Sequence, residues 1–186
     1  MKRILSLILV VVLALSLAAC GQKGSAGGGL IKVGIVNNPP SESGYRAANV
    51  KDFEDVFKEA NGYKVSTYYS LKNDEQLNAA QQFITDKVDY LLISAAATDG
   101  WTNVLENAKK AGIKVFLFDR MMNVDESLYE AAVISDMAAE GNMAVQWLID
   151  QKLPEYNVVH IQGAMGSDAQ IGRTKALDEQ FAKGAM

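Results

Sequence analysis

Short apolar runs and amphipathic stretches take turns along the chain. The apolar runs are rich in β-branched and aromatic residues and predict strands over residues 30–36, 64–70, 88–94, 113–119, 129–135 and 156–163. Between these runs, apolar residues recur at every third or fourth position, which predicts helices over residues 74–86, 101–112, 137–151 and 168–183. A further helix before Gly62 should turn Phe53, Val56, Phe57 and Ala60 inward.

Strands that alternate with helices form βαβ units and pair in parallel. Because the crossovers in such sheets are right-handed, helices cover both faces, and the chain is expected to adopt an α/β fold with a doubly wound parallel sheet. Ligands of these folds bind at the carboxyl ends of the strands. That edge should be formed by the loops over residues 37–46, 70–74, 94–101, 119–123, 135–137 and 163–173.

The N-terminal residues predict export from the cytoplasm. Lys2 and Arg3 precede an uninterrupted apolar run, and a Gly/Ser-rich stretch follows it. The run is short for a membrane span, so residues 1–19 are interpreted as a signal peptide rather than a membrane helix or a buried helix. The segment LAAC, which ends at Cys20, resembles the bacterial lipobox, in which the cysteine becomes the lipid-modified N-terminus. Residues 20–29 would then be a lipidated cysteine and a flexible tether at the outer face of a bacterial membrane.

The cysteine count and the charge narrow the set of partners. Cys20 is the only cysteine, so it has no disulfide partner and no metal-binding cluster around it. Loss of residues 1–19 removes Lys2 and Arg3 from the 18 basic residues and leaves 22 acidic ones, a net charge of −6. A mildly acidic chain without a basic stretch argues against nucleic-acid binding. The length beyond the tether suits one domain, or slightly more than one.

The loops carry no complete enzyme signature. NNPPSESG follows the first strand in place of a G-x-G-x-x-G turn, and the glycines of residues 163–170 lack the lysine of a phosphate-binding loop. His160 lies in a predicted apolar strand and is interpreted as a structural hydrogen-bonding residue, and no nucleophile elbow is present. Glu42 and Asp119 could face a cleft together as a glycosidase carboxylate pair, which remains a minor alternative. No cofactor and no metal are expected.

The fourth predicted strand ends in Asp119 and Arg120, a carboxylate beside a guanidinium. One interpretation is a surface ion pair at the start of a loop. The alternative is a ligand site, because a carboxylate accepts hydrogen bonds from hydroxyls and a planar guanidinium donates a fork of them. A fixed pair of this kind can recognise vicinal hydroxyls on a sugar ring. We favour the second interpretation.

The loop SESGYR after the first strand adds further polar groups. Ser41, Glu42 and Arg46 could contact a ligand, and Tyr45 could offer a stacking surface. The simpler interpretation of the serines is that Ser41 or Ser43 caps the following helix, and both roles can coexist. Trp101 is expected to pack in the core beneath its helix rather than contact a ligand.

Several of these motifs together resemble the sugar-binding type 1 periplasmic binding proteins, the extracytoplasmic receptors of ribose- and galactose-type ABC importers. They are VGIVNNPPSESGYRAAN, DYLLISAAATDGW, AKKAGIKVFLFDR, VISDMAAEGNMAVQWLI and VVHIQGAMGSDAQIGR. The resemblance begins at Leu30 and runs to the C-terminus, and SESGYR and DGW are most similar to galactofuranose-type binders.

This resemblance implies two α/β lobes that close about a hinge on one monosaccharide. It places ligand contacts on Asp119, on Arg120 and within Ser41 to Arg46. It also implies a contact from the second lobe by Arg173, for which a solvated helix residue is the alternative.

The expected lobes are an N-terminal sugar-binding lobe over residues 30–152 and the beginning of a second lobe over residues 153–186. One strand and one helix cannot bury a core, so the second part should be poorly stabilised. The chain is expected to be either a fragment of a longer protein or a half-receptor, and the fragment is favoured. The expected function is capture of a galactofuranose-, galactose- or ribose-like monosaccharide for an ABC permease. A sensor that presents its ligand to a chemoreceptor or a histidine kinase is the alternative. A transcription regulator would need a helix-turn-helix in place of the export signal.

Overall fold

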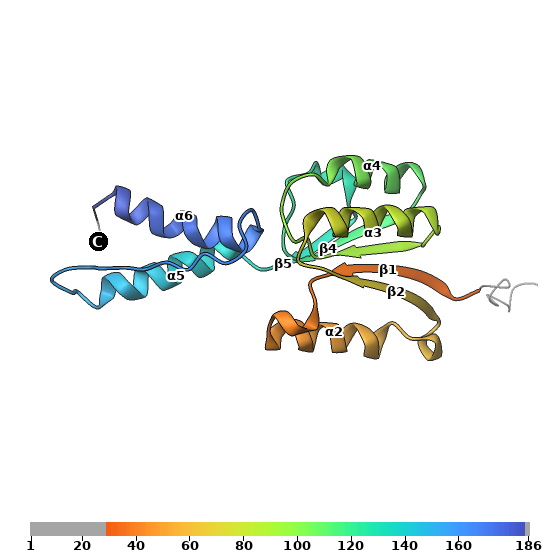
Figure 1. The fold of residues 1–186 in the computed structure, drawn as a ribbon, viewed down its shortest axis with the longest axis horizontal. Helices are drawn as coiled ribbons and strands as arrows, with labels where there is room; N and C mark the ends of the chain where they lie inside the picture. The colour runs from red at the N-terminus through yellow and green to blue at the C-terminus, as the bar shows by residue number, and fades with distance from the viewer. Residues whose placement is uncertain (1–28, 185–186) are drawn as a thin grey trace, which may run out of the picture.

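The computed structural model describes residues 29–184, and the predicted signal peptide and Cys20 lie outside this range. Its centre is a parallel sheet in the order β2-β1-β3-β4-β5 (Figure 1). The strands are β1 (Ile31–Asn37), β2 (Tyr63–Tyr69), β3 (Tyr90–Ile93), β4 (Lys114–Asp119) and β5 (Ala131–Ile134). All four strand pairs are parallel, which brings the carboxyl ends of the strands to one edge. The predicted α/β fold is confirmed.

Helices lie on both faces of the sheet, as the doubly wound prediction requires. Helix α2 (Gly44–Val56) covers one face, and α3 (Asn73–Thr85) and α4 (Thr102–Lys110) cover the other (Figure 1). Short 3-10 turns are η1 (Pro40–Glu42), η2 (Glu59–Asn61) and η3 (Glu126–Leu128).

The main core lies between the sheet and the α3–α4 face. Leu91 and Leu117 of the sheet pack there with Trp101 and Leu105 of the α4 region, all at most 1% exposed. Burial of each such side chain stabilises the fold by about 1.5–3 kcal/mol. Helix α3 approaches the sheet closely because Gly34 has no side chain: a Cβ there would lie 2.8 Å from the ring of Phe83.

The inward face expected for the first helix was partly wrong. Phe53 packs against the sheet, with its ring 4.9 Å from that of Phe118, centroid to centroid. Val56, however, is 52% exposed, and Ala60 is exposed as well. Helix α2 ends at Val56 and Phe57 leaves the helical conformation, so the helical period does not reach Ala60.

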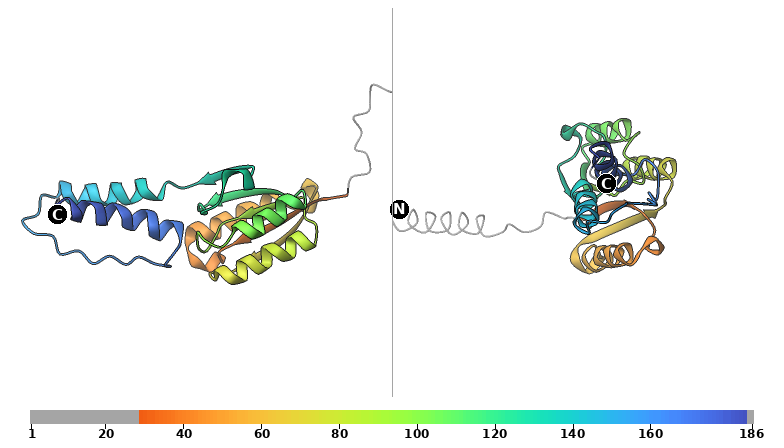
Figure 2. Two further views of the ribbon diagram at one scale, coloured as in Figure 1. Left: turned by 90° about the horizontal axis from the view of Figure 1, so that it is seen from above. Right: turned by 90° about the vertical axis from the view of Figure 1, so that its left-hand side faces the viewer.

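Helices α5 (Met137–Asp150) and α6 (Asp168–Ala182) form a parallel pair that projects from the sheet (Figures 1 and 2). Two glycines bring their backbones together: a Cβ on Gly172 would lie 2.6 Å from Cβ of Met137, and a Cβ on Gly141 would lie 2.8 Å from Cα of Arg173. Close packing therefore joins α5, which belongs to the lobe expected over residues 30–152, to α6 of the part expected over residues 153–186, and the boundary at residue 152 stays a prediction.

The strand predicted over residues 156–163 was wrong. The chain runs back along the helix pair without strand pairing there, and Val159 and Ile161 are both 90% exposed. His160 is exposed too and does not lie in a buried strand. A strand requires a hydrogen-bonded neighbour, and the described part of the chain places none beside this segment.

No helix within residues 29–184 is both long and apolar enough to cross a membrane. In the same range, no group of three or more His, Cys, Asp or Glu side chains is arranged to hold a metal ion.

Candidate functional site

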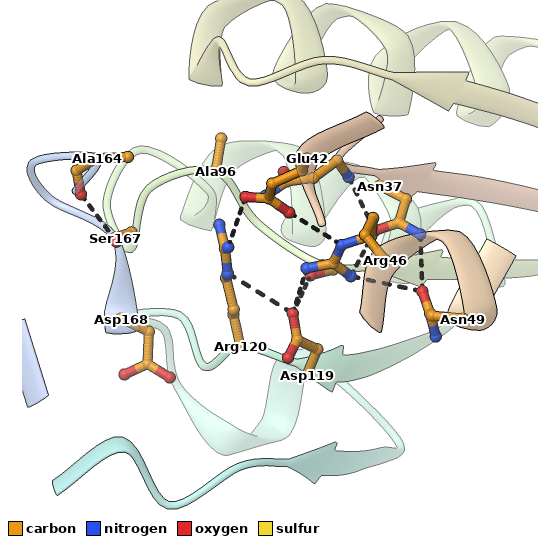
Figure 3. Close-up of polar contacts among 12 residues, drawn as sticks. Asn37, Glu42, Arg46, Asn49, Ala96, Asp119, Arg120, Ala164, Ser167 and Asp168 are labelled. Carbon is orange, nitrogen blue, oxygen red and sulfur yellow. Dashed lines mark hydrogen bonds and ion pairs between the residues drawn. The ribbon is translucent and has the colours of Figure 1, made fainter. Parts of the chain in front are cut away.

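Five polar side chains meet at the carboxyl edge of the sheet, and we call them the polar cluster: Asn37, Glu42, Arg46, Asp119 and Arg120 (Figure 3). They come from the end of β1, from η1, from the first turn of α2 and from the end of β4. Segments that are far apart in the sequence thus meet where parallel-sheet folds bind their ligands.

The turn into α2 sets the spacing of two members of the polar cluster. Pro40 opens η1, and Ser43 caps α2 by accepting a hydrogen bond from the backbone N–H of Arg46 at 3.1 Å. This confirms Ser43 as the capping serine, whereas Ser41 is exposed. The turn brings together the side chains of Glu42 and Arg46, which lie four residues apart, and Nε of Arg46 donates to Oε2 of Glu42 at 3.1 Å.

Arg46 is the buried centre of the polar cluster, with 1% of its side chain exposed. Besides its bond to Glu42, it donates from Nη1 to Oδ1 of Asn37 at 2.8 Å and to Oδ1 of Asn49 at 3.4 Å, and from Nη2 to Asp119. Two carboxylates therefore offset a buried positive charge that would otherwise be costly. All three nitrogens of its guanidinium are engaged, so Arg46 holds the polar cluster together, and direct ligand contact by Arg46 stays a prediction.

Asp119 ends β4 in an unusual backbone conformation, with φ of +64°. Asp is among the few residues that adopt this left-handed region without large strain. Its carbonyl accepts a hydrogen bond from the N–H of Ser135 at 3.1 Å, which ties the end of β4 to the chain leaving β5. Its carboxylate accepts from Arg46 and, at 3.2 Å, from Oγ of Ser94.

Glu42 and Arg120 form the more accessible side of the polar cluster. Nη2 of Arg120 donates to Oε1 of Glu42 at 2.9 Å, and the two side chains are 12% and 25% exposed. Burial raises the pKa of Glu42, but the charge of Arg120 and hydrogen bonds from Arg120, Arg46 and Asn38 outweigh it and lower the pKa overall. Glu42 is therefore ionised at neutral pH and offers acceptors to hydroxyl groups.

Tyr45 is 58% exposed, and its ring lies 5.4 Å from the guanidinium carbon of Arg46. It lines a cavity of about 440 Å³ together with Asp119 and Ser135, and this cavity extends from the polar cluster over the apolar α2 face of the sheet. Tyr45 is thus open as a stacking surface. Trp101, by contrast, is fully buried and donates to the carbonyl of Ala97 at 3.0 Å, which confirms its core role.

Arg173 does not join the polar cluster. It lies on α6, is 51% exposed and pairs with Glu140 of α5 at 2.6 Å. Its role in ligand binding stays a prediction. The helix pair instead contacts the loop that follows β4: Oδ2 of Asp168 accepts a hydrogen bond from the backbone N–H of Met121, the residue after Arg120, at 2.9 Å. Figure 3 shows Asp168 near Arg120 and Asp119.

Sequence reasoning missed several polar residues around the site: Asn37, Asn38, Asn49, Ser94 and Asp168. Asn37 and Asn38 had a usable signal, because they directly follow an apolar strand at the carboxyl edge. Asn49 and Ser94 had none, because short polar residues in a helix or at a strand end are common.

The arrangement suits recognition better than acid–base chemistry. Glu42 and Asp119 each bond to Arg46, and the lowered pKa of Glu42 is opposite to what a general acid requires. The paired carboxylates and guanidinium groups instead present fixed acceptors and donors side by side.

The chain matches known proteins over most of its described length. A family model described as "Periplasmic binding protein domain" matches residues 33–185. The galactofuranose-binding protein YtfQ of Escherichia coli (strain K12) is 37% identical over 143 residues, which cover 75% of this chain and 44% of YtfQ. The fructose import binding protein FruE of Bifidobacterium longum (strain NCC 2705) is 32% identical over 139 residues, covering 72% of this chain and 42% of FruE.

Similarity extends to solved structures. A crystal structure of a galactofuranose binding protein matches with a TM-score of 0.75 and 33% identity, covering 82% of this chain and 52% of that one. The fold and the matched family model together define the class: this chain belongs to the periplasmic binding protein domain family. It spans less than half the length of the two curated relatives described above.

Proposed function

We propose that this chain supplies the ligand-capturing edge of an extracytoplasmic receptor that binds a monosaccharide for an ABC importer. The observation that carries the proposal is the polar cluster, in which Glu42 and Arg120 present an acceptor and a donor 2.9 Å apart at the carboxyl edge of the sheet. The names of the relatives, one a galactofuranose-binding protein and one a fructose import binding protein, support a sugar as the ligand class.

The residues divide into contact and support roles. Glu42, Arg120 and Asp119 are proposed to bind sugar hydroxyls, and the exposed ring of Tyr45 to cover the apolar face of the sugar. Exposed Ser41 borders the same edge. Arg46 is a support, because its donors already hold two carboxylates and two asparagine side chains in place.

The helix pair is proposed to close over the bound sugar from the opposite side. Two hydrogen bonds support this: the N–H of Thr98 donates to the carbonyl of Gly166 at 3.0 Å, and the N–H of Met121 donates to Asp168 at 2.9 Å. The link between the two regions is short, from the end of β5 at Ile134 to the start of α5 at Met137. Closure about this link would bring Arg173 toward the ligand.

Membrane attachment is part of the same proposal. Residues 1–19 would direct export, and a lipid on Cys20 would hold the receptor beside the permease that takes over the sugar. Labelling cells with a radioactive fatty acid tests this, because wild-type protein should carry the label and Cys20→Ser should not.

Titration calorimetry against a panel of pentoses and hexoses, including furanose forms, tests the binding proposal. At least one monosaccharide should bind with one site per chain, and a ribitol or glycerol control should bind much more weakly. The absence of heat with every sugar of the panel would refute the proposed function.

A further inference from the structure

Gln76 lies in the first half of α3 with no exposed surface, and its amide contacts the ends of three strands. Nε2 donates to the carbonyl of Ser70 after β2 at 2.8 Å and to Oδ1 of Asn38 after β1 at 3.1 Å, and it lies 3.4 Å from the carbonyl of Ser94 after β3. Oε1 accepts from the N–H of Ala96 at 2.8 Å. Both ends of this amide are therefore used.

The orientation of this amide is fixed by its surroundings. The N–H of Ala96 needs an acceptor, and three oxygens on the other side need a donor, so a reversed amide would leave buried polar groups facing like groups. Because this amide is fixed, a side chain that bonds to its Nε2 must turn an acceptor atom toward it.

The orientation of the Asn38 amide follows from its bond to Gln76. It has no exposed surface, and its Oδ1 accepts from Gln76, so its Nδ2 faces the other way and donates to Oε1 of Glu42 at 2.9 Å. The same oxygen of Glu42 accepts from Arg120. Contacts thus run without a break from Gln76 through Asn38 to the accessible side of the polar cluster.

We infer that Gln76 is a positioning residue of the sugar site: it turns the Asn38 amide toward Glu42 and thereby holds the Glu42 carboxylate beside Arg120. The inference rests on the proposed function for its consequence, which is tighter sugar binding. Its structural step, the hold on Glu42, can be measured without any sugar.

The first experiment measures the pKa of Glu42 by carbon-13 NMR titration of the sugar-free chain. The charged groups that face Glu42 are Arg46 and Arg120, and Asp119 shares the same arginines. Gln76→Met should raise the pKa of Glu42, because the hydrogen bond from Asn38 is no longer held in place. Gln76→Glu keeps the size and shape of the side chain but places a carboxylate oxygen against three acceptor oxygens. It should therefore also raise the pKa of Glu42.

Gln82 on the exposed side of the same helix offers matched controls. Gln82→Met and Gln82→Glu should leave the pKa of Glu42 at its wild-type value, because Gln82 bonds only to Asp86 among the described residues. An unchanged pKa in the folded Gln76 variants would overturn the inference. Loss of the folded spectrum in both Gln76 variants would assign Gln76 to the fold alone and would overturn it as well.

The second experiment is a double-mutant cycle on sugar affinity. Gln76→Met should weaken binding by about 3- to 10-fold, the scale of one hydrogen bond, and the loss should shrink to within about twofold in a Glu42→Gln background. An equal loss in both backgrounds would show that Gln76 does not act through Glu42. Absence of sugar binding in the wild type would refute the proposed function, while the pKa measurement still decides on the hold that Gln76 has on Glu42.

Discussion

The sheet edge and the helix pair differ in how completely they bury their large and charged side chains. At the sheet edge, Arg46 and Asp119 are buried and their charges are paired within the described structure. In the helix pair, α5 and α6 pack closely where Gly141 and Gly172 lie. Elsewhere in the pair, Trp147 is 63% exposed and Met143 67% exposed. The comparison teaches that the candidate site is built on a rigid region, whereas the part proposed to close over it has little core of its own.

The two tryptophans should show the largest difference in stability between these regions. Trp101→Ala should lower the free energy of unfolding by about 3–5 kcal/mol, because it opens a cavity in the core. Trp147→Ala should change it by less than about 0.5 kcal/mol, because this side chain is already in water. Urea unfolding measures both, and similar losses would show that the helix pair is better packed than its exposure indicates.

Two arginines extend the comparison to charges. Arg46→Ala should lower the free energy of unfolding by about 3 kcal/mol, because Asp119 would be left buried without its main partner. Arg173→Ala removes an exposed ion pair and should cost less than about 1 kcal/mol. Thermal unfolding at low salt compares the two, and a large loss for Arg173→Ala would contradict the contrast.

Sugar affinity tests whether the two regions act together. Arg120→Ala should weaken binding by about 10- to 100-fold, because it removes charge-assisted hydrogen bonds. Arg173→Ala should also weaken binding if the helix pair closes over the ligand. Lys109→Ala, on an exposed face of α4, is the control and should bind like the wild type. Calorimetry measures all three, and equal affinity of Arg120→Ala and Lys109→Ala would mean that the site has been misplaced.

The seam between α5 and α6 can be opened by one methyl group. Gly172→Ala would place a Cβ 2.6 Å from that of Met137, so the helices must separate at a cost of about 1–3 kcal/mol. Hydrogen exchange should accelerate in α6 and stay unchanged in β1 and β3. Gly44→Ala at the open start of α2 is the control, because a Cβ there meets nothing within 4 Å.

The smallest effect is the pH dependence that Glu42 contributes. Its pKa is lowered in the folded protein, so the unfolded chain binds its proton more tightly. The stabilisation is therefore present above the ordinary glutamate pKa and is lost as the pH falls through the lower, folded value. Subtracting the free energy of unfolding of Glu42→Gln from that of the wild type across this acidic range isolates the contribution of the Glu42 charge. This difference should shrink as the pH falls, and a difference that grows toward acid would contradict the prediction.

The sequence predicted the sheet well because its strands and most helices follow from local periodicity and from capping residues such as Ser43. It failed over residues 156–163, where the pattern shows that a strand is possible but cannot supply a partner. It also failed at Ala60, because the apolar pattern continues past Val56, where the helix stops.

The site was predictable only in part. Asp119 and Arg120 were found because charged residues that directly follow an apolar strand are conspicuous. The burial of Arg46 was not predictable, because it depends on Asn37, Asn49 and Asp119, which three separate elements bring together. Asp168 was missed for the same reason, since its partner Met121 lies far away in the sequence.

The left-handed backbone of Asp119 limits which amino acids can occupy that position. Gly and Asn tolerate positive φ best, although Lys87 and Lys152 show that other residues can adopt it in this chain, and neither Gly nor Asn carries the negative charge of Asp119. If the proposed sugar site is correct, a change of sugar preference should arise more readily at neighbours with ordinary backbones, such as Tyr45, than at Asp119. Saturation mutagenesis at residue 119 should accordingly recover few folded variants, whereas the same library at residue 45 should yield many.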